Sequence, residues 1–140
     1  MHDTAQFPDL KGASVFITGG GSGIGAFLTE GFLEQGANVA FVQRSDATAF
    51  CDEMEGKHGV RPLFIPCDIT DVDALKSAID QAAAAHGPVT TLVNNAANDK
   101  RHSTAEEDAE IWDWMIAINF KAYFFACQAV IPGMQAAGGG

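Results

Sequence analysis

The clearest candidate for a chemical role is the stretch TGGGSGIG, which runs from Thr18 to Gly25 and holds five glycines among eight residues. Glycine adopts backbone angles that cost other residues free energy, and it leaves no Cβ in the way of an approaching ligand. If a helix begins within the stretch, its first N–H groups and its dipole favour an anion such as a pyrophosphate. The stretch therefore predicts a phosphate-binding turn, although a tight turn without a ligand would use the same residues.

The elements around this stretch are those that such a turn connects. An apolar run at 13–17 precedes it, and apolar residues at helical spacing follow from 24 to 35. The same alternation of a short apolar strand and a helix continues along the chain. We expect further strands at 39–42, 63–65 and 91–93, and further helices at 46–57, 71–85 and 108–135.

This order of elements predicts an α/β protein with one domain over residues 1–140. Continuous apolar strands that alternate with helices form a parallel sheet covered on both faces, which is a Rossmann-type doubly wound fold. Short right-handed connections give the strand order 3-2-1-4. The fourth strand is then left with an open edge.

Composition argues against several classes of function. The chain has 8 Lys and Arg against 18 Asp and Glu, a net charge of −10, which disfavours nucleic acid and anionic membranes as partners. Cys51, Cys67 and Cys127 form no CxxC pair, so we expect reduced thiols in a cytoplasmic protein and no metal site. The N-terminal residues lack the apolar segment of a signal peptide, and no apolar run reaches the roughly 18 residues of a membrane span.

The glycine spacing Gly19-x-x-x-Gly23-x-Gly25 differs from the common GxGxxG. It resembles the short-chain dehydrogenase/reductase family, whose members are NAD(P)-dependent oxidoreductases with a Rossmann fold. Asp68 after the third expected strand and the NNAA at 94–97 after the fourth also match family motifs, as does the Asn of IAINF in the last helix. The resemblance covers the chain from about residue 10 to its end.

The resemblance implies roles for individual residues. Asn119 is similar to the family's catalytic-tetrad Asn, which holds a water in a proton relay; the alternative is a residue at a helix kink without a chemical role. Asp68 is implied to contact the adenine. Together the implied cofactor-binding residues are Gly19, Gly21, Ser22, Gly23, Ile24, Gly25, Asp68, Ile69, Asn95, Ala96, Ala97 and Ile118.

Two residues depart from the family pattern. Ala97 stands where the family has a glycine, which costs little if the backbone there keeps a negative φ. Phe27 stands where the family has a small residue, and its ring would push the first helix off the sheet unless Gly31, one turn further along the same face, leaves it room.

The end of the second expected strand bears on the choice of cofactor. An Asp or Glu there would bind both ribose hydroxyls of NAD and repel a 2′-phosphate. The chain instead has Gln43, Arg44 and Ser45, and Arg44 and Ser45 are suited to binding a 2′-phosphate. We therefore expect NADP, with NAD as the alternative because Asp46 is close by. Arg44 would otherwise be a surface cation over the adenine.

The segment after the fourth expected strand bears on the choice of substrate. Asn98, Arg101 and His102 follow a central strand at its carboxyl end, where ligands bind in open α/β sheets. The pattern is similar to that of xylose-type and related aldose dehydrogenases of the family, which oxidise the anomeric carbon to a lactone. The resemblance implies a sugar or polyol substrate. A solvated polar loop and a keto-acyl or steroid-like alcohol substrate are the alternatives.

The expected helix at 108–135 carries apolar residues on two sides. Such a helix needs two partners, of which one is its own sheet. The family commonly uses this helix between subunits, so the second partner is expected to be another copy in a homodimer or homotetramer.

The family's hydride transfer also needs a Ser and a Tyr-x-x-x-Lys motif. In the family both lie on and after a fifth strand, which follows the elements expected here. The one tyrosine of the chain, Tyr123, has no Lys four residues on, and we expect it to be a packing residue. We therefore expect the cofactor-binding half of a longer oxidoreductase, inactive alone. The alternatives are a non-catalytic NAD(P)-binding module and a scaffold that another chain completes.

Overall fold

A computed structural model describes residues 5–140 of the chain. The first four residues, which belong to the segment expected to lack a signal peptide, lie outside the described part. Four parallel strands form one sheet in the order β3-β2-β1-β4, as the sequence predicts. The strands are β1 (Ser14–Thr18), β2 (Asn38–Gln43), β3 (Leu63–Pro66) and β4 (Thr91–Val93).

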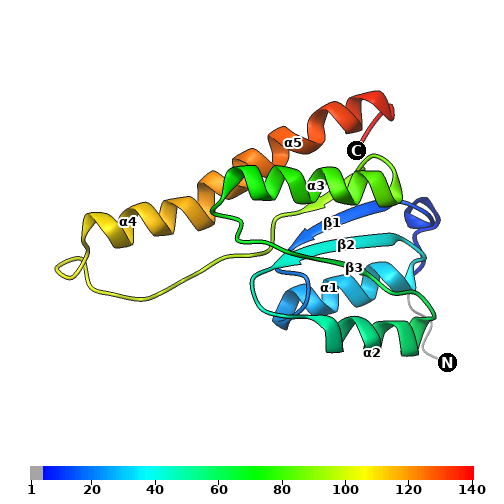
Figure 1. The fold of residues 1–140 in the computed structure, drawn as a ribbon, viewed down its shortest axis with the longest axis horizontal. Helices are drawn as coiled ribbons and strands as arrows, with labels where there is room; N and C mark the ends of the chain where they lie inside the picture. Colours follow the sequence, from blue (N-terminus) through cyan, green and yellow to red (C-terminus); the bar gives the residue numbers. More distant parts are fainter. Residues whose placement is uncertain (1–4) are drawn as a thin grey trace.

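Helices cover both faces of the sheet (Figure 1). On one face lie α1 (Gly23–Glu34) and α2 (Thr48–His58), and on the other lie α3 (Val72–His86) and α5 (Ala122–Ala136). A short 3-10 helix, η1 (Pro8–Leu10), precedes β1. Because β1 and β2 are central, their middle residues are fully buried, with Phe16 facing the α3 and α5 layer and Phe41 facing the α1 and α2 layer. The doubly wound fold is therefore confirmed.

The helix ends agree with the expected bounds to within about two residues, and local hydrogen bonds explain where they fall. Asp46 does not lie within α2, because its carboxylate accepts hydrogen bonds from the N–H (3.3 Å) and the hydroxyl (2.7 Å) of Thr48 and so precedes the helix. Asp71 caps α3 by accepting a hydrogen bond from the Ala74 N–H at 3.0 Å.

The long C-terminal helix is continuous but not regular. It consists of α4 (Ala109–Ile116), a π-helical turn η2 (Ala117–Lys121) and α5, which contains Pro132. Only α5 has buried residues, and Figure 1 shows α4 extending beyond the sheet. Asn119 lies in the π-helical turn, an irregularity that often marks a functional site.

The same helix is more apolar than expected. Ala109–Ala136 has 28 residues and a mean hydropathy of 1.4 in its most apolar window, which by length and composition is enough to cross a membrane. In the fold, however, Ala122, Ala126 and Val130 are buried at four-residue intervals in the core that α3 also lines. This stripe packs α5 against α3, but only 17% of the most apolar window of the long helix is buried.

Candidate functional site

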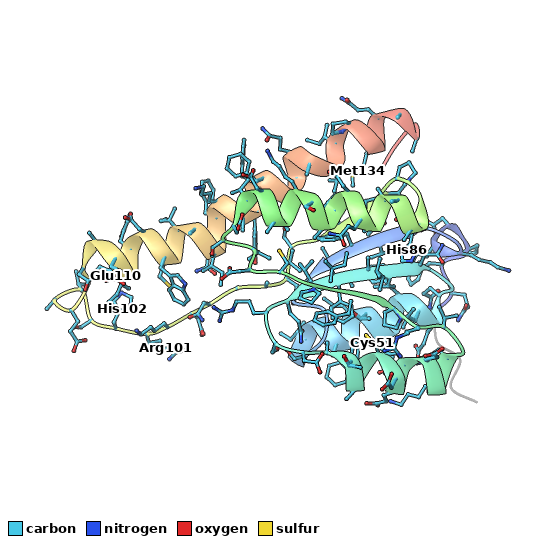
Figure 2. The ribbon with its side chains drawn as sticks, in the orientation of Figure 1. Cys51, His86, Arg101, His102, Glu110 and Met134 are labelled. Carbon is cyan, nitrogen blue, oxygen red and sulfur yellow. The ribbon has the colours of Figure 1, made fainter. Side chains whose placement is uncertain are left out.

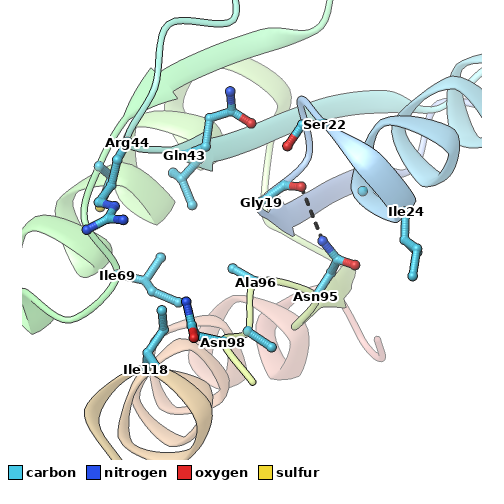
Figure 3. A pocket seen from close by; sticks show the side chains of 14 residues that line it. Gly19, Ser22, Ile24, Gln43, Arg44, Ile69, Asn95, Ala96, Asn98 and Ile118 are labelled. Atoms are coloured by element: carbon cyan, nitrogen blue, oxygen red, sulfur yellow. Dashed lines mark hydrogen bonds between the residues drawn. The ribbon is translucent and has the colours of Figure 1, made fainter. Parts of the chain in front are cut away.

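A cavity of about 360 Å³ lies at the carboxyl ends of the strands (Figure 3). It collects residues at or just after the ends of β1, β2, β3 and β4, together with residues of the first turn of α1 and one residue of the long helix. This is the edge of an open α/β sheet at which ligands bind. The lining residues are Gly19, Ser22, Ile24, Gly25, Val42, Gln43, Arg44, Cys67, Ile69, Asn95, Ala96, Ala97, Asn98 and Ile118.

The cavity brings together most of the residues that the sequence singles out. Val42, Gln43 and Cys67 line it too, although sequence reasoning did not select them. The remaining predicted residues lie outside its lining; they are Gly21, Gly23, Ser45, Asp68, Arg101, His102 and Asn119.

The glycines of the turn have two roles: some adopt backbone angles that favour glycine, and others lie where there is no room for a Cβ. Gly19 and Gly23 have φ values of 71° and 53°, in the left-handed region that favours glycine. A Cβ on Gly25 would collide with the carbonyl oxygen of Gly19, and a Cβ on Gly20 would collide with the side chain of Phe41. Gly20 was not selected from the sequence, because nothing in the local spacing shows that a ring of β2 lies against it.

The first turn of α1 opens onto this site. Ser22 is the N-cap residue, in extended conformation, and its side chain makes no capping hydrogen bond. The N–H groups of the first helical turn are orphan donors, and the positive end of the helix dipole lies there as well. Because Ser22, Ile24 and Gly25 all line the cavity, the helix terminus is suited to a phosphate group.

Asn95 ties the end of β4 to the glycine turn (Figure 3). Its Nδ2 donates to the carbonyl oxygens of Thr18 (3.0 Å) and Gly19 (3.2 Å). In return, the buried Thr18 hydroxyl accepts hydrogen bonds from the N–H groups of Asn95 and Ala96, both at 3.0 Å. These bonds fix the two loops that form one wall of the cavity. Thr18 was not among the predicted site residues, although it begins the glycine stretch.

Neither departure from the family pattern disturbs the fold. No non-glycine residue among 5–140 has a positive φ, so Ala97 keeps the backbone geometry that an alanine tolerates, as expected. The concern about Phe27 is wrong, because its ring is 77% exposed and does not face the sheet. Gly25, Thr29 and Leu33 are the buried residues of α1. Phe27 lies two residues from both Gly25 and Thr29, about 200° around the helix from each.

Gln43 holds the glycine turn against the end of β2. Its Oε1 accepts a hydrogen bond from the Gly21 N–H at 3.0 Å, and its Nε2 donates to the carbonyl and the hydroxyl oxygen of Ser45 at 3.1 and 3.2 Å. The N–H of Gly21 is therefore already bonded within the protein. Sequence reasoning noted Gln43 only as a missing carboxylate.

Arg44 and Asp68 face each other across the rim of the cavity. Their closest side-chain atoms, Nη1 and Oδ2, are 3.9 Å apart, and both side chains are largely exposed, at 69% and 46%. Asp68 Oδ1 accepts hydrogen bonds from the N–H and the hydroxyl of Thr70, at 3.0 and 2.8 Å. Burial opposes the charged form of Asp68, but these two bonds and the Arg44 charge outweigh it and lower the pKa of Asp68.

Asn119 holds the loop after β4 in place. Its Oδ1 accepts a hydrogen bond from the Asn98 N–H at 2.9 Å, and its Nδ2 donates to the Asn98 carbonyl oxygen at 2.8 Å. The pair satisfies both backbone groups of a residue that lines the cavity. Asn119 thus acts on the site indirectly, by positioning Asn98. The Asn119 Nδ2 also lies 3.9 Å from the sulfur of Met115, one helical turn earlier.

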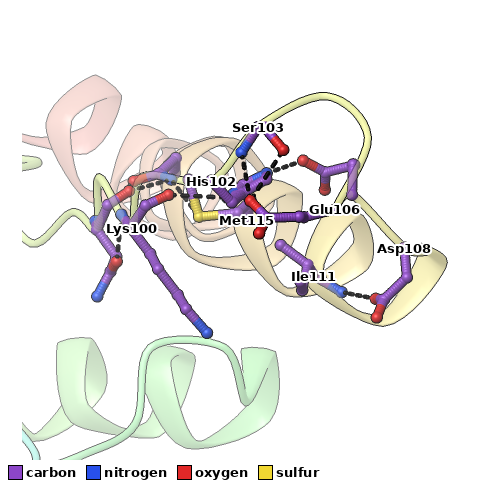
Figure 4. A network of polar contacts seen from close by, with 10 residues as sticks. Lys100, His102, Ser103, Glu106, Asp108, Ile111 and Met115 are labelled. Carbon is purple, nitrogen blue, oxygen red and sulfur yellow. Dashed lines mark hydrogen bonds and ion pairs between the residues drawn. The ribbon is translucent and has the colours of Figure 1, made fainter.

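Arg101 and His102 lie at the far end of the molecule, beside α4 (Figure 2). The His102 ring contacts the Lys100 carbonyl oxygen through Nδ1 at 3.0 Å, and it contacts the Glu107 carboxylate through Nε2 (Figure 4). Glu106 accepts hydrogen bonds from the N–H and the hydroxyl of Ser103, which close the same loop. The structure therefore brings Asn98 to the cavity but not Arg101 or His102.

Tyr123 packs as expected and also makes a hydrogen bond. Its hydroxyl donates to the Ala96 carbonyl oxygen at 2.9 Å, and burial raises the pKa of the phenol. The bond supports the cavity wall from behind, so the hydroxyl is engaged with the backbone.

Comparison with known proteins agrees with this geometry. The model of the family described as short chain dehydrogenase matches residues 13–140. A protein named "Probable galactose dehydrogenase" from Rhizobium meliloti is 46% identical over 139 residues, which are 98% of this chain and 54% of that protein. A D-xylose 1-dehydrogenase from Caulobacter vibrioides is 44% identical over the same shares of both chains.

Among solved structures, a blue fluorescent protein from a metagenomic library, in complex with NADPH, has a TM-score of 0.84 and 35% identity. The match covers 89% of this chain and 52% of that one. The chain spans about half the length of the curated relatives it matches. With its family motifs, its strand order and the site at the edge of its sheet, the chain belongs to the short-chain dehydrogenase family.

Proposed function

We propose that the chain binds NAD(P) in the cavity at the carboxyl edge of the sheet and supplies this half of a short-chain dehydrogenase site. The observation that carries the proposal is the uncapped N-terminus of α1, which opens into the cavity beside the glycine turn. Gly19 shapes this turn: a Cβ there would lie 3.1–3.2 Å from Ala96 and Asn95, so the glycine lets the turn pack closely against the end of β4.

In this proposal each residue has a binding role. The turn from Gly19 to Gly25 holds the pyrophosphate, with Ser22 at the helix terminus. Arg44, Ile69 and Ile118 border the part of the cavity that is suited to the adenosine, and Asn95, Ala96 and Ala97 form the opposite wall. The bound nicotinamide ring would accept or supply a hydride. Asp68 acts at the rim, through its pairing with Arg44.

The preferred cofactor is NADP. Arg44 is largely exposed, and its ion pair with Asp68 is long, so its guanidinium is free to form a bidentate contact with a 2′-phosphate. Gln43 is neutral and repels no phosphate. Ser45 keeps a lesser role, because Gln43 already donates to its hydroxyl oxygen. The solved relative that contains NADPH supports this preference by similarity.

The proposed substrate is a sugar or another polyol. Two relatives carry the names of galactose and xylose dehydrogenases, and Asn98 offers an amide at the cavity. Arg101 and His102 would contribute only if the loop folded back toward the cavity. Asn119 positions Asn98 and, as the resemblance implies, supports the proton relay.

The chain alone is proposed to bind the cofactor without turning over substrate. Its one tyrosine donates to the Ala96 carbonyl oxygen and therefore offers no hydroxyl proton to a substrate. The long helix is proposed to pack against a second copy in a homodimer or homotetramer of a cytoplasmic protein. Its exposed apolar side chains are Trp112, Ile116, Phe120, Phe124 and Ile131.

Calorimetric titration with NADP⁺ and with NAD⁺, followed by an assay of cofactor reduction with D-xylose and D-galactose, tests these proposals. We expect saturable binding of one cofactor per chain and no turnover. Absence of binding by a folded chain would contradict the proposal for the cavity, and turnover would contradict the assignment of Tyr123.

A further inference from the structure

A second cluster of ligand-type side chains lies away from the cavity, on the side of the molecule formed by α1 and α2. Glu30 and Glu34 come from α1 and His58 is the last residue of α2; one ligand atom of each lies within 4.8 Å of the others. We propose that these three residues form a binding site for a divalent transition-metal ion of the Zn²⁺ type, which would join the two helices. The sequence predicted no metal site, because the residues are far apart along the chain.

The backbone holds the three ligands in place. Glu30 and Glu34 are four residues apart on one helix and so lie on the same face. Gly59 ends α2 directly after His58, with a left-handed φ of 70°, and α1 and α2 lie side by side on one face of the sheet (Figure 1). All three ligands are thus carried by the two helices rather than by loops, which favours a defined site.

The distances suit a tetrahedral ion. His58 Nε2 and Glu30 Oε1 are 3.1 Å apart. Two ligands at the usual zinc distances of about 2.0–2.2 Å are roughly 3.4 Å apart in tetrahedral geometry. The Glu34 carboxylate lies within 4.8 Å of the other two ligand atoms and would have to move closer to reach the same separation, and a water would complete the coordination.

The chemistry of the set selects the kind of ion. One imidazole with two carboxylates matches the nitrogen and oxygen ligands of zinc, whereas Mg²⁺ and Ca²⁺ prefer oxygen ligands alone. A patch of carboxylates alone would serve Mg²⁺ and Ca²⁺ without any imidazole. The imidazole therefore distinguishes a metal site from a merely acidic surface.

The charged groups around the three ligands are compatible with a bound cation. Lys57 now lies 3.4 Å from Glu30, but it is closer to Glu53, at 2.7 Å, and can keep that pairing when an ion enters. Within residues 5–140, the side chain of Glu34 makes no hydrogen bond or ion pair, and it is exposed. The net charge of −10 also favours uptake of a cation.

Titration of the chain with Zn²⁺, monitored by calorimetry and thermal unfolding, tests the site. We expect one saturable site and a higher unfolding temperature that EDTA reverses. His58→Gln and Glu34→Gln should each weaken Zn²⁺ binding by roughly tenfold or more. His102→Gln and Glu110→Gln, which make the same changes elsewhere, should leave the affinity unchanged.

Nuclear magnetic resonance of the histidine side chains in the unaltered chain gives a measurement that does not depend on how the variants fold. Zn²⁺ at one equivalent should shift the ring signals of His58 and leave those of His86 and His102 in place, and Mg²⁺ should shift none of them. Equal affinity in His58→Gln and His102→Gln, equal binding of Mg²⁺, or shifts spread over all histidines would overturn the proposal.

Discussion

The side chain of Asn119 pairs with the backbone of Asn98 through two hydrogen bonds, of 2.9 and 2.8 Å. This connects the π-helical turn of the long helix to the cavity. The Asn119 side chain satisfies both the backbone N–H and the backbone carbonyl of Asn98. Removing that side chain therefore leaves these two partly buried groups without partners.

Asn119→Ala should therefore lower the free energy of unfolding by about 1–3 kcal/mol. Urea unfolding followed by circular dichroism measures this change. Asn98→Ala is the matched control, because it keeps the backbone groups that Asn119 binds and removes only the bond from the Lys100 N–H. A smaller loss in Asn119→Ala than in Asn98→Ala would refute the role of the pair.

Gly25→Ala should destabilise the chain by about 3 kcal/mol or more, since the new Cβ would collide with the Gly19 carbonyl oxygen. Gly31→Ala in the same helix has open space at its Cβ and should stabilise by about 0.4–1 kcal/mol. Thermal unfolding of both variants checks the contrast. Similar effects of the two substitutions would mean that the close approach of the turn to α1 is not the reason for Gly25.

Arg44→Ala should weaken NADP⁺ binding by roughly tenfold or more, because a hydrogen bond to a charged group contributes about 1.5–3 kcal/mol. The affinity for NAD⁺ should change little. Arg101→Ala removes the same charge outside the cavity and serves as the control for NADP⁺. Equal losses for both cofactors in Arg44→Ala would argue against recognition of a 2′-phosphate.

The expected strand order is correct because each strand is a continuous apolar run and each connection is short, so few topologies remain. What the sequence leaves open is how side chains bond across elements. Gln43, at the end of β2, accepts a hydrogen bond from Gly21 in the turn after β1, and no local sequence pattern indicates that contact. His102 turns to Glu107 inside its own loop, which only the path of that loop determines.

Phe27 shows that a family pattern can also mislead about how a side chain packs. The family pattern at this position gave the wrong expectation, although helical geometry alone places residue 27 away from the stripe formed by Gly25, Thr29 and Leu33. The sequence likewise predicts a helix at 108–135, but it indicates neither the π-helical turn at Ala117–Lys121 nor the two bonds that Asn119, within that turn, makes to Asn98.

Asp68 should make stability depend on pH in the acid range. Its pKa in the folded chain lies below the usual 3.8, so it stabilises the folded state above that value and loses the effect as the pH falls through the folded pKa. The difference in unfolding free energy between the parent chain and Asp68→Asn should therefore shrink as the pH is lowered below 3.8. A difference that is constant with pH would show that the charge of Asp68 has no role.

Cys67 should resist alkylation. Burial is the main cause that raises the pKa of its thiol to about 11, and the neighbouring Asp68 and Asp71 act in the same direction. The thiolate is the reactive form, so iodoacetamide at neutral pH should label the exposed Cys127 at least roughly tenfold faster than Cys67. Mass spectrometry of peptides gives both rates, and equal rates would contradict the environment described for Cys67.

The most direct test of the central claim is an amide ¹H–¹⁵N spectrum of the chain during titration with NADP⁺. Binding in the cavity at the carboxyl edge should shift the amides of 19–25, 43–45 and 95–98 and leave those of α2 and the far half of α3 unchanged. If a folded chain shows no shifts, or shifts centred on residues outside this cavity, the assignment of the cofactor site is wrong.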